Sequence, residues 1–528
     1  MKKNPGKNYI YIIAACLFTY LFYFIFEYIF TDGQMGVPLD DTWIHFQFAD
    51  NFVKGYFFQF NPGEPAAGTT SPFYVIVLGT TSFLIKNFIV NSIFLSALFF
   101  LLSCIFIYKI SLSIFKSENS PLKSITSNYI SAESISLIVS LLTVFAGRFA
   151  WAALSGMETT MFTFFCILGI YFHIKNLQSK KFTLIPALFL SLATVSRPEG
   201  FLLFGLYLAD VFLNLKKDKV FKKNIFTLAF SILIFLIITF PYLIFSYSIT
   251  GHFFPNTFRG QGGNLTFIPD FYYLFRAIAY FISDNLIIGL LYIVSVFFYF
   301  KNINKYFTDL KYLNLIFLWI ILLPLVSSIL IPNYRHHLRY LIPLIPFVNI
   351  AGMYILMLLF KKNYFLKIKG ILFKRKNSLA LIILLSFVYY IVFAVALGKN
   401  TDNINNQQVK LAGWVSENVG RNETIALNDI GAITFINKNR IIDMAGLVTP
   451  ELLRYRTYRW EDNLDSINYL LKKNNVSYII IYDEWFKEYL DKYKDSFTFV
   501  TSAYLEDNTI CGAKEMKVYK TNFYGKKD

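Results

Sequence analysis

Long apolar runs recur along the first three quarters of the chain and are separated by short polar segments. Three of these runs are Tyr9–Phe30, Ile225–Ile249 and Leu379–Leu397. A helix needs roughly 20 residues to cross the hydrocarbon core of a bilayer, so each run predicts a membrane-spanning helix. The pattern predicts about eleven crossings, at residues 9–30, 88–115, 134–150, 158–174, 183–196, 200–215, 224–248, 286–300, 313–331, 341–360 and 379–397.

One further apolar segment, Pro72–Ile85, does not fit a full crossing. It is short and begins with proline. With the N-terminus in the cytoplasm, the first span places Thr31–Ser71 outside. If Pro72–Ile85 also crossed, every later basic cluster would lie on the wrong side of the membrane. We therefore predict a re-entrant or interfacial helix here.

After Leu397 the pattern changes to alternating helical and strand-like stretches in a polar background. Helices are expected at 407–419 and 464–474, and strands at 424–427, 441–443 and 478–482. The chain thus divides into a membrane domain, residues 1–397, and a small α/β domain, residues 398–528. The same alternation of sides places this second domain outside, on the periplasmic face of a bacterial inner membrane.

Composition supports the membrane assignment. The 528 residues are 55% hydrophobic and only 16% charged, whereas soluble proteins carry about a quarter charged residues. The net charge of +17 comes from short clusters between spans, which is the positive-inside pattern. This distribution favours membrane lipids as partners and argues against nucleic acid. The clusters comprise Lys2, Lys3 and Lys7; Lys175, Lys180 and Lys181; Lys216, Lys217, Lys219, Lys222 and Lys223; Lys301, Lys305 and Lys311; and residues 361–376.

Two adjacent carboxylates, Asp40 and Asp41, follow the first span. Ionisable groups near apolar surface cost on the order of 2–3 kcal/mol each, so something other than packing keeps them there. Adjacent carboxylates raise each other's pKa, and one of them could act as a base near neutral pH. The pair could also hold Mg²⁺ or Mn²⁺ through oxygen ligands, or it could simply cap the predicted helix Thr42–Lys54.

Other polar residues occur in short segments on the same predicted outer face. Glu158 begins a span, where the helix dipole would favour it. Arg197 and Glu199 join two closely spaced spans and could pair with each other or contact a substrate. His252 and Asn256 lie in the predicted loop 251–270, which includes the glycine-rich segment Arg259–Gly263. A lone histidine in a loop is more often structural, and Asn256 could bind hydroxyl groups or cap a turn.

Four potential cations lie between two late spans: Arg335, His336, His337 and Arg339. A cluster on the outer face favours an anion, and arginine presents the planar fork of donors that phosphate accepts. Anchoring at lipid headgroups is the alternative. We predict no zinc site, because adjacent histidines on a helix point apart. The four cysteines form no disulfide framework or metal-spaced cluster either.

The order of these motifs resembles that of the bacterial GT-C glycosyltransferases, in the branch around the mycobacterial terminal arabinofuranosyltransferase. The resemblance extends from about residue 36 to 345 and into the tail. The motifs that carry it are Asp40-Asp41, Asn61-Pro62-Gly63-Glu64, Thr70-Ser71-Pro72, Ser155-Gly156-Met157-Glu158-Thr159, Arg197-Pro198-Glu199-Gly200, Gly251-His252, Pro255-Asn256-Thr257, Arg339-Tyr340 with Pro343, Asn428-Asp429-Ile430-Gly431-Ala432 and Asp443-Met444-Ala445-Gly446-Leu447.

This resemblance implies a GT-C fold and an inverting transferase. The donor would be a sugar on a polyprenyl phosphate, and the acceptor an envelope glycan, lipid or protein. Asp40, with Asp41 beside it, takes the position of the catalytic aspartate. Because this chain carries three extra cationic side chains before Arg339, the group that contacts the phosphate is left open. Substrate contacts are expected from Glu64, Glu158, Arg197, Glu199, His252, Asn256, Arg335, His336, His337 and Arg339.

Two other functional classes are open. A transporter or flippase of lipid-linked saccharides would show polar residues at mid-bilayer depth and internal repeats, whereas here the unusual polar residues gather at one face. If the protein were a scaffolding subunit, the external carboxylates and cations would have no functional role.

Overall fold

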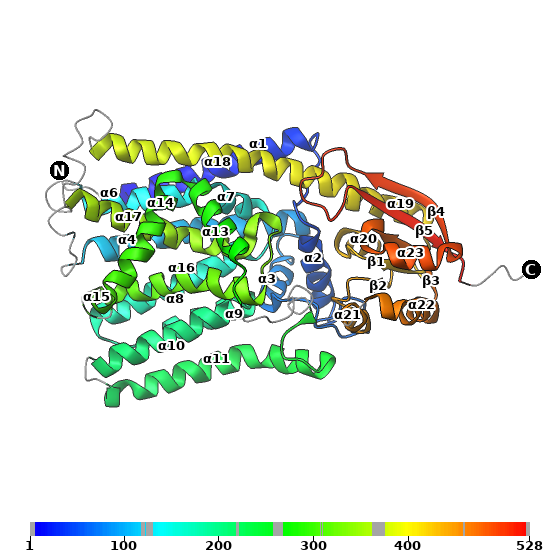
Figure 1. Cartoon of the computed structure of the whole chain (residues 1–528), viewed down its shortest axis with the longest axis horizontal. Coiled ribbons are helices and arrows are strands. Elements are labelled where there is room, and N and C mark those ends of the chain that lie inside the picture. The colour runs from blue at the N-terminus through cyan, green and yellow to red at the C-terminus, as the bar shows by residue number, and fades with distance from the viewer. Residues whose placement is uncertain are drawn as a thin grey trace, which may run out of the picture.

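The computed structural model describes residues 6–117, 122, 130–217, 221–256, 268–306, 308, 310–361, 375–457 and 460–523. A helical bundle forms one end of an elongated molecule and an α/β domain forms the other (Figure 1). Several features that the sequence predicts fall outside the described residues. They are Lys2, Lys3, Lys219, most of the basic cluster 361–376, and residues 257–267 with the segment Arg259–Gly263.

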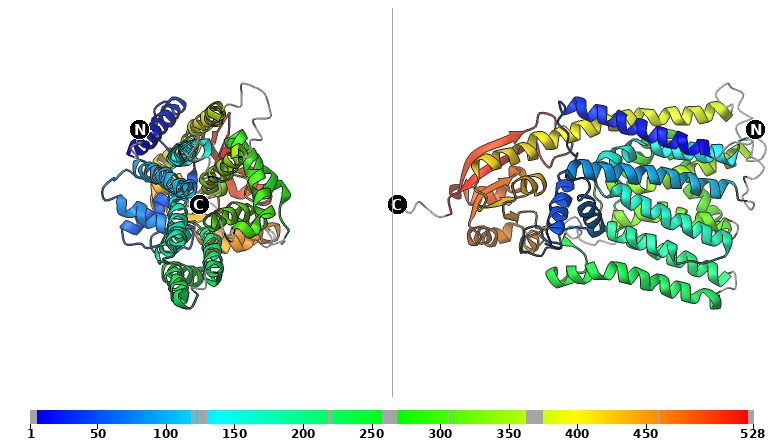
Figure 2. Two further views of the ribbon diagram at one scale, coloured as in Figure 1. Left: turned by 90° about the vertical axis from the view of Figure 1, so that its left-hand side faces the viewer. Right: turned by 180° about the vertical axis from the view of Figure 1, so that it is seen from behind.

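Each of the eleven predicted spans corresponds to a helix of the bundle, which Figure 2 shows nearly end-on. Within the described residues, seven helices are long and apolar enough to cross a membrane, judged by length and composition. The other four predicted spans correspond to the shorter helices α9, α10 and α14 and to the bent pair α6–α7. The helices at the predicted spans are α1 (Gly6–Phe30), α4 (Phe88–Phe115), α6 (Ala132–Val144), α8 (Thr159–Ser179), α9 (Ile185–Ser196), α10 (Gly200–Lys217), α11 (Phe221–Thr250), α14 (Leu286–Lys301), α16 (Lys311–Leu330), α17 (Ile345–Lys361) and α18 (Arg375–Ile404).

The span predicted at 134–150 ends earlier than expected. α6 stops at Val144, and the chain bends by 61° into α7 (Gly147–Leu154). The bend brings Gly147 against α18, where a Cβ atom would lie 2.4 Å from the carbonyl oxygen of Tyr389. Glycine is needed for this close approach, and the sequence pattern, which is apolar on both sides of the bend, did not reveal it.

Two helices lie across the end of the bundle, between it and the α/β domain (Figure 1). They are α2 (Asp40–Val53) and α3 (Pro72–Thr81). α3 has ten residues, about half of what a crossing needs, in agreement with the interfacial helix predicted there. The remaining helices of this part are α13 (Phe271–Asp284), α15 (Ile303–Tyr306) and η1 (His336–Leu344).

The C-terminal domain is built on a five-stranded mixed sheet of order β2-β1-β3-β5-β4. β1, β2 and β3 are parallel, whereas β5 runs antiparallel to both β3 and β4. The first three strands are short and largely buried, as expected for parallel strands covered by helices. The strands are β1 (Thr424–Leu427), β2 (Ile441–Asp443), β3 (Val476–Ile481), β4 (Phe497–Tyr504) and β5 (Glu515–Thr521).

The helices of this domain connect it directly to the membrane part. α18 passes through residue 397 without a break and continues by a π-helical turn, η4 (Asn405–Val409), into α19 (Lys410–Asn418). The predicted domain boundary therefore lies inside a continuous helix. The other helices are α20 (Gly431–Asn437), α21 (Pro450–Thr457), η5 (Trp460–Asn463), α22 (Leu464–Lys473), η6 (Asp483–Trp485), α23 (Lys487–Lys492) and η7 (Lys494–Ser496).

Candidate active site

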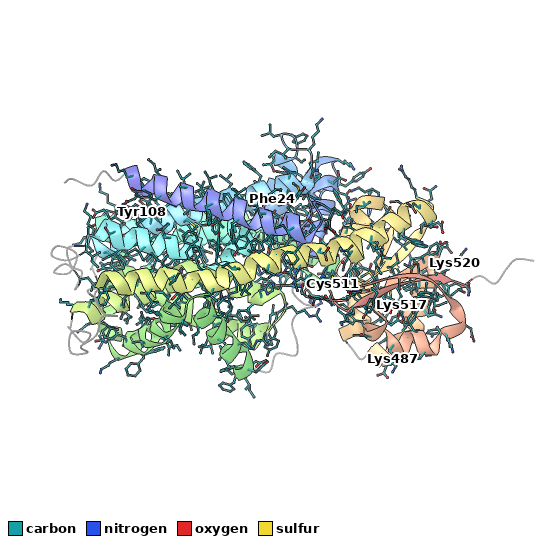
Figure 3. All side chains as sticks on the ribbon, turned by 90° about the horizontal axis from the view of Figure 1, so that it is seen from above. Phe24, Tyr108, Lys487, Cys511, Lys517 and Lys520 are labelled. Carbon is teal, nitrogen blue, oxygen red and sulfur yellow. The ribbon has the colours of Figure 1, made fainter. Side chains whose placement is uncertain are left out.

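A cavity of about 530 Å³ lies at the junction of the bundle and the C-terminal domain. Cys511, on the loop between β4 and β5, marks this junction in Figure 3. The volume of the cavity falls in the range of small-molecule sites, about 300–1,000 Å³. The lining residues are Leu39, Asp40, Asp41, Ile44, Tyr280, Tyr334, Arg335, His336, His337, Ile404, Gln408, Asn428, Asp429, Ile430, Ala445, Leu447, Trp485, Asn508, Thr509, Ile510, Cys511 and Gly512.

Asp40 connects the two domains at this cavity. Its Oδ2 accepts a hydrogen bond from the backbone N–H of Gly431 (2.7 Å), and its Oδ1 accepts one from Ala432 (2.8 Å). The contact depends on glycine, because a Cβ atom at position 431 would lie 2.2 Å from the carbonyl oxygen of Asp40. The capping alternative for the pair is not what the structure shows: Leu39 is the N-cap residue of α2, and no side chain caps the helix.

The two aspartates have opposite electrostatic environments. Burial, together with the nearby carboxylate of Asp429, raises the pKa of Asp40 to about 8, against the two backbone hydrogen bonds. Burial acts in the same direction on Asp41, but the charge of Arg339, the neighbouring His336 and His45 and the hydrogen bond from Arg339 together outweigh it and lower that pKa. Nη2 of Arg339 lies 2.5 Å from Oδ2 of Asp41. The site therefore holds one carboxyl group that accepts a proton readily and one that stays ionised.

The basic residues 335–339 come from a tightly turned segment, in which burial lowers the pKa of His336 and of His337, so the positive charge is that of Arg335 and Arg339. His336, His337 and Leu338 have φ angles of 53°, 60° and 52°, in the left-handed region that residues other than glycine rarely adopt. The turn is held by its surroundings: His337 Nε2 lies 3.1 Å from Oδ1 of Asn400, and Arg148 donates to the His337 carbonyl oxygen. Backbone strain of this kind persists where packing imposes it, often at functional sites.

A second charged cluster lies beside this segment. Arg197, only 2% exposed, bridges Glu158 (3.0 Å) and Glu199 (3.1 Å), and its guanidinium stacks over the ring of Tyr340. Although burial opposes ionisation, Arg197 and His45 lower the pKa of Glu158 to about 2. The pairing of Arg197 with Glu199, which the sequence left open, is present. A smaller cavity of about 170 Å³ is lined by Arg197, Glu199, Tyr340 and apolar side chains of α10 and α16.

Glu158 and Arg339 line neither cavity but contact Arg197 and Asp41, which do, whereas three further predicted site residues lie away from both cavities. Glu64 accepts a hydrogen bond from Arg440 (2.7 Å) at the edge of the domain contact. His252 is exposed at the end of α11, and its carbonyl oxygen accepts a hydrogen bond from Ser246. Asn256 is buried, and its backbone N–H donates to the carbonyl oxygen of Ala67. The structure thus gathers Asp40, Asp41, Arg335, His336, His337 and Arg339, with Glu158, Arg197 and Glu199 alongside.

Sequence reasoning did not assign a role to Asp429, which reaches the cavity from the C-terminal domain. It accepts hydrogen bonds from the Tyr482 hydroxyl (2.6 Å), Gln408 (2.9 Å) and Asn428 (3.1 Å). Trp485, from the same domain, lies under the guanidinium of Arg335 at 5.3 Å. The signal for Asp429 was present, since it belongs to a motif noted in the tail, but its placement depends on how the domains dock.

A polar network inside the bundle was also missed. Asp210 contacts His173 (2.6 Å) and Asn314 (2.6 Å), and Asn314 accepts a hydrogen bond from Tyr299 (2.8 Å). The expectation that unusual polar residues gather only at one face was therefore wrong. These groups are buried and hydrogen-bonded to one another, which indicates a link among α8, α10, α14 and α16. An aspartate within an apolar run was the signal that could have found the network.

The carboxylates do not form a ligand set for Mg²⁺ or Mn²⁺. Within the described residues, no three His, Cys, Asp or Glu side chains are arranged to hold a metal ion. Both oxygens of Asp40 accept backbone N–H groups, and Asp41 is engaged by Arg339. The described residues therefore offer no set of three such ligands for a divalent cation.

Solved structures of two membrane enzymes resemble this chain. ArnT from Cupriavidus metallidurans, bound to undecaprenyl phosphate, aligns with a TM-score of 0.59 and 11% identity over 98% of each chain. The oligosaccharyltransferase AglB from Archaeoglobus fulgidus was solved with an inhibitory peptide and a dolichol-phosphate. It aligns with a TM-score of 0.58 and 11% identity over 96% of this chain and 74% of its own.

These likenesses establish the fold of the chain: a GT-C fold, a polytopic helical membrane domain followed by a C-terminal α/β domain. Residues 402–519 also match the model of a domain of unknown function, DUF8728. No curated protein matches the sequence. At identities this low the likeness shows the fold alone, so activity has to be argued from the site.

Proposed function

We propose that this protein is a glycosyltransferase that moves a sugar from a polyprenyl-phosphate donor to a hydroxyl group of an acceptor. The observation that carries the proposal is that Asp40, Asp41, Arg335 and His336 line one cavity, while Arg339 pairs with Asp41. The carboxylates and the basic residues come from distant segments of the chain: Asp41 and Arg339 are 298 residues apart. A site with both a base and fixed cations, at a membrane surface, suits displacement of a lipid phosphate.

In the proposed reaction the acceptor oxygen attacks the anomeric carbon from the face opposite the lipid phosphate. Asp40 takes the hydroxyl proton, and its raised pKa makes it the stronger base of the pair. The bond between the anomeric carbon and the phosphate oxygen breaks, and the phosphate leaves with the electron pair. Arg335, at the cavity wall, and Arg339, behind Asp41, stabilise the developing negative charge. The anomeric configuration is inverted.

The smaller cavity suits the start of the isoprenoid chain. Its apolar walls come from α10 and α16, and its charged residues are Arg197 and Glu199. Tyr340 lines it and also lies under the guanidinium groups of Arg197 (4.6 Å) and Arg339 (5.5 Å). An apolar tail there would therefore leave its phosphate close to the cations. Both structural neighbours were solved with a polyprenyl or dolichyl phosphate, which supports this assignment.

We also propose, on the basis of the sequence, a location, a substrate class and a branch of the GT-C fold for this protein. The protein would reside in a bacterial inner membrane, with the cavity and the C-terminal domain on the periplasmic side. It would transfer a hexose or pentose to an envelope glycan, lipid or protein, for example in lipopolysaccharide synthesis. Within the GT-C fold it would belong with the branch around the mycobacterial terminal arabinofuranosyltransferase.

A donor-consumption assay tests the function directly. The purified protein in nanodiscs is given undecaprenyl-phosphate-linked glucose or decaprenyl-phosphate-linked arabinose, together with a bacterial envelope extract. We expect release of the polyprenyl phosphate from one donor and incorporation of its sugar into the extract. If neither donor is consumed, while the intact lipid-linked sugar changes leaflet in proteoliposomes, the protein is a flippase instead.

The pH dependence of transfer follows from the raised pKa of Asp40. The base is inactive while protonated, so activity should increase with pH until Asp40 is ionised. We expect kcat/KM to rise about tenfold per pH unit on the acid side and to level off above a pH of about 8. Steady-state kinetics across this range measure the midpoint. A flat profile would show that Asp40 does not act as the base.

A further inference from the structure

The cavity has two chemically different walls. The wall from the membrane domain carries Asp40, Asp41 and the basic segment 335–337, in which Arg335 is the charged residue. The wall from the C-terminal domain carries amide, carboxylate and aromatic side chains, and none of its described lining residues is cationic. Arg335 supplies the positive charge at the cavity, so a phosphate would be held beside it, and the carboxylate of Asp429 would repel a phosphate.

Asp429 is the charged residue of the second wall, and its hydrogen-bond partners there are neutral. Its Oδ2 accepts from Tyr482 and Gln408, and its Oδ1 accepts from Asn428. An ionised carboxylate offers about four acceptor positions, so one remains for a further donor. Burial raises the pKa of this group, against the hydrogen bonds from Tyr482 and Gln408 and the weaker effect of the Arg335 charge. A neutral hydroxyl group is the kind of donor that this position suits.

The segment Asn428–Ala432 also places Asp429 next to the proposed base. Its backbone N–H groups at Gly431 and Ala432 hold Asp40, and two residues earlier the same segment presents Asp429 to the cavity. The raised pKa of Asp40 is partly due to the negative charge of Asp429, so the two carboxyl groups are close enough to interact. A molecule that donates a hydroxyl to Asp429 would hold neighbouring hydroxyls near Asp40.

We propose that Asp429 is a substrate-binding residue supplied by the C-terminal domain, and that it holds a hydroxyl group of a saccharide acceptor beside Asp40. This inference rests on the proposed function and adds the acceptor class and the residue that selects it. A saccharide offers several neighbouring hydroxyls, so one can bind Asp429 while the next loses its proton to Asp40. The donor phosphate would bind beside Arg335, whose guanidinium lies over Trp485.

Saturation-transfer NMR with methyl glycosides of glucose, galactose and arabinose tests the binding without any lipid donor. We expect at least one glycoside to show a saturation-transfer signal with the wild-type protein in nanodiscs, and the signal to disappear with Asp429→Ala. Asp465→Ala is the matched control, because Asp465 lies on the same domain but is exposed and pairs with Lys492. This control should bind as the wild type does.

Kinetics with the lipid donor separate this inference from the proposed function. Using the best-binding glycoside as acceptor, Asp429→Asn should raise the acceptor KM about tenfold and leave the donor KM within about twofold. Equal acceptor KM values in wild type and variant, or binding of a serine-containing peptide in place of all glycosides, would overturn the inference while transfer itself stands. If the wild-type protein binds glycosides through Asp429 but consumes no donor, the proposed function fails and the saccharide site remains.

Discussion

Asp40→Asn is expected to lower the rate of sugar transfer by about 10²–10⁴-fold, the usual contribution of a positioned base. The amide cannot accept the proton of the attacking hydroxyl group. It is nearly the same size as the carboxylate and retains one oxygen, which can accept from the backbone N–H of Gly431 or of Ala432, so one of these two hydrogen bonds is kept. The protein should therefore still assemble in the membrane. The measurement is transfer with a polyprenyl-phosphate donor, alongside gel filtration in detergent.

A matched control is available on the same helix. Asp50 also contacts the C-terminal domain, through Lys438 at 2.7 Å, but it does not line the cavity. Asp50→Asn weakens the domain contact and leaves the proposed base in place, so it should retain most activity. If Asp50→Asn abolishes transfer as strongly as Asp40→Asn, the effect comes from domain docking and the assignment of Asp40 as base is wrong.

Arg339→Ala is expected to reduce transfer by about 10²–10³-fold, comparable with removing one donor from an anion-stabilising site. The arginine is 6% exposed and pairs with Asp41. Without it, the negative charge of Asp41 is uncompensated beside the place where the phosphate would bind. The donor KM should rise, and Arg339→Lys should recover part of the loss because it restores the charge but not the planar fork.

Arg440→Ala is the control for loss of an arginine. Arg440 pairs with Glu64 at the rim of the domain contact, where both side chains are at least 40% exposed. Exposed pairs contribute little, about 0–1 kcal/mol, so this variant should keep near-normal activity. An Arg339→Ala protein with an unchanged donor KM would show that the phosphate lies elsewhere.

Much of the membrane architecture could be predicted because it depends on local sequence. A run of about twenty apolar residues predicts a crossing wherever it occurs, and the basic clusters fix how the crossings alternate. The break between α6 and α7 could not be predicted in this way. It depends on Gly147 packing against Tyr389, which is distant in sequence. The strand β4 was missed because its exposed residues obscure the period expected of a buried strand. The strand β5 was missed although its residues alternate between buried and partly buried positions.

The candidate site was predictable in part. Asp40, Asp41 and the cations of segment 335–339 were identified by charge in places where charge is costly. The contact between these carboxylates and the segment 335–339 could not be predicted, since it joins distant parts of the chain. The contact between Asp40 and Gly431 spans 391 residues and exists only once α20 docks on α2. The pKa of Asp40 is raised and that of Asp41 is lowered by tertiary contacts of this kind, so no sequence pattern could have separated the roles of the two aspartates.

The most direct test of the central claim is a structure of the protein in nanodiscs with undecaprenyl phosphate, determined by electron cryo-microscopy. We expect the phosphate oxygens in the 530 Å³ cavity, about 3 Å from the guanidinium nitrogens of Arg335 or Arg339. The isoprenoid chain should leave along α10 and α16. Density for the phosphate outside this cavity, or at the opposite end of the bundle, would contradict the proposed glycosyltransferase site.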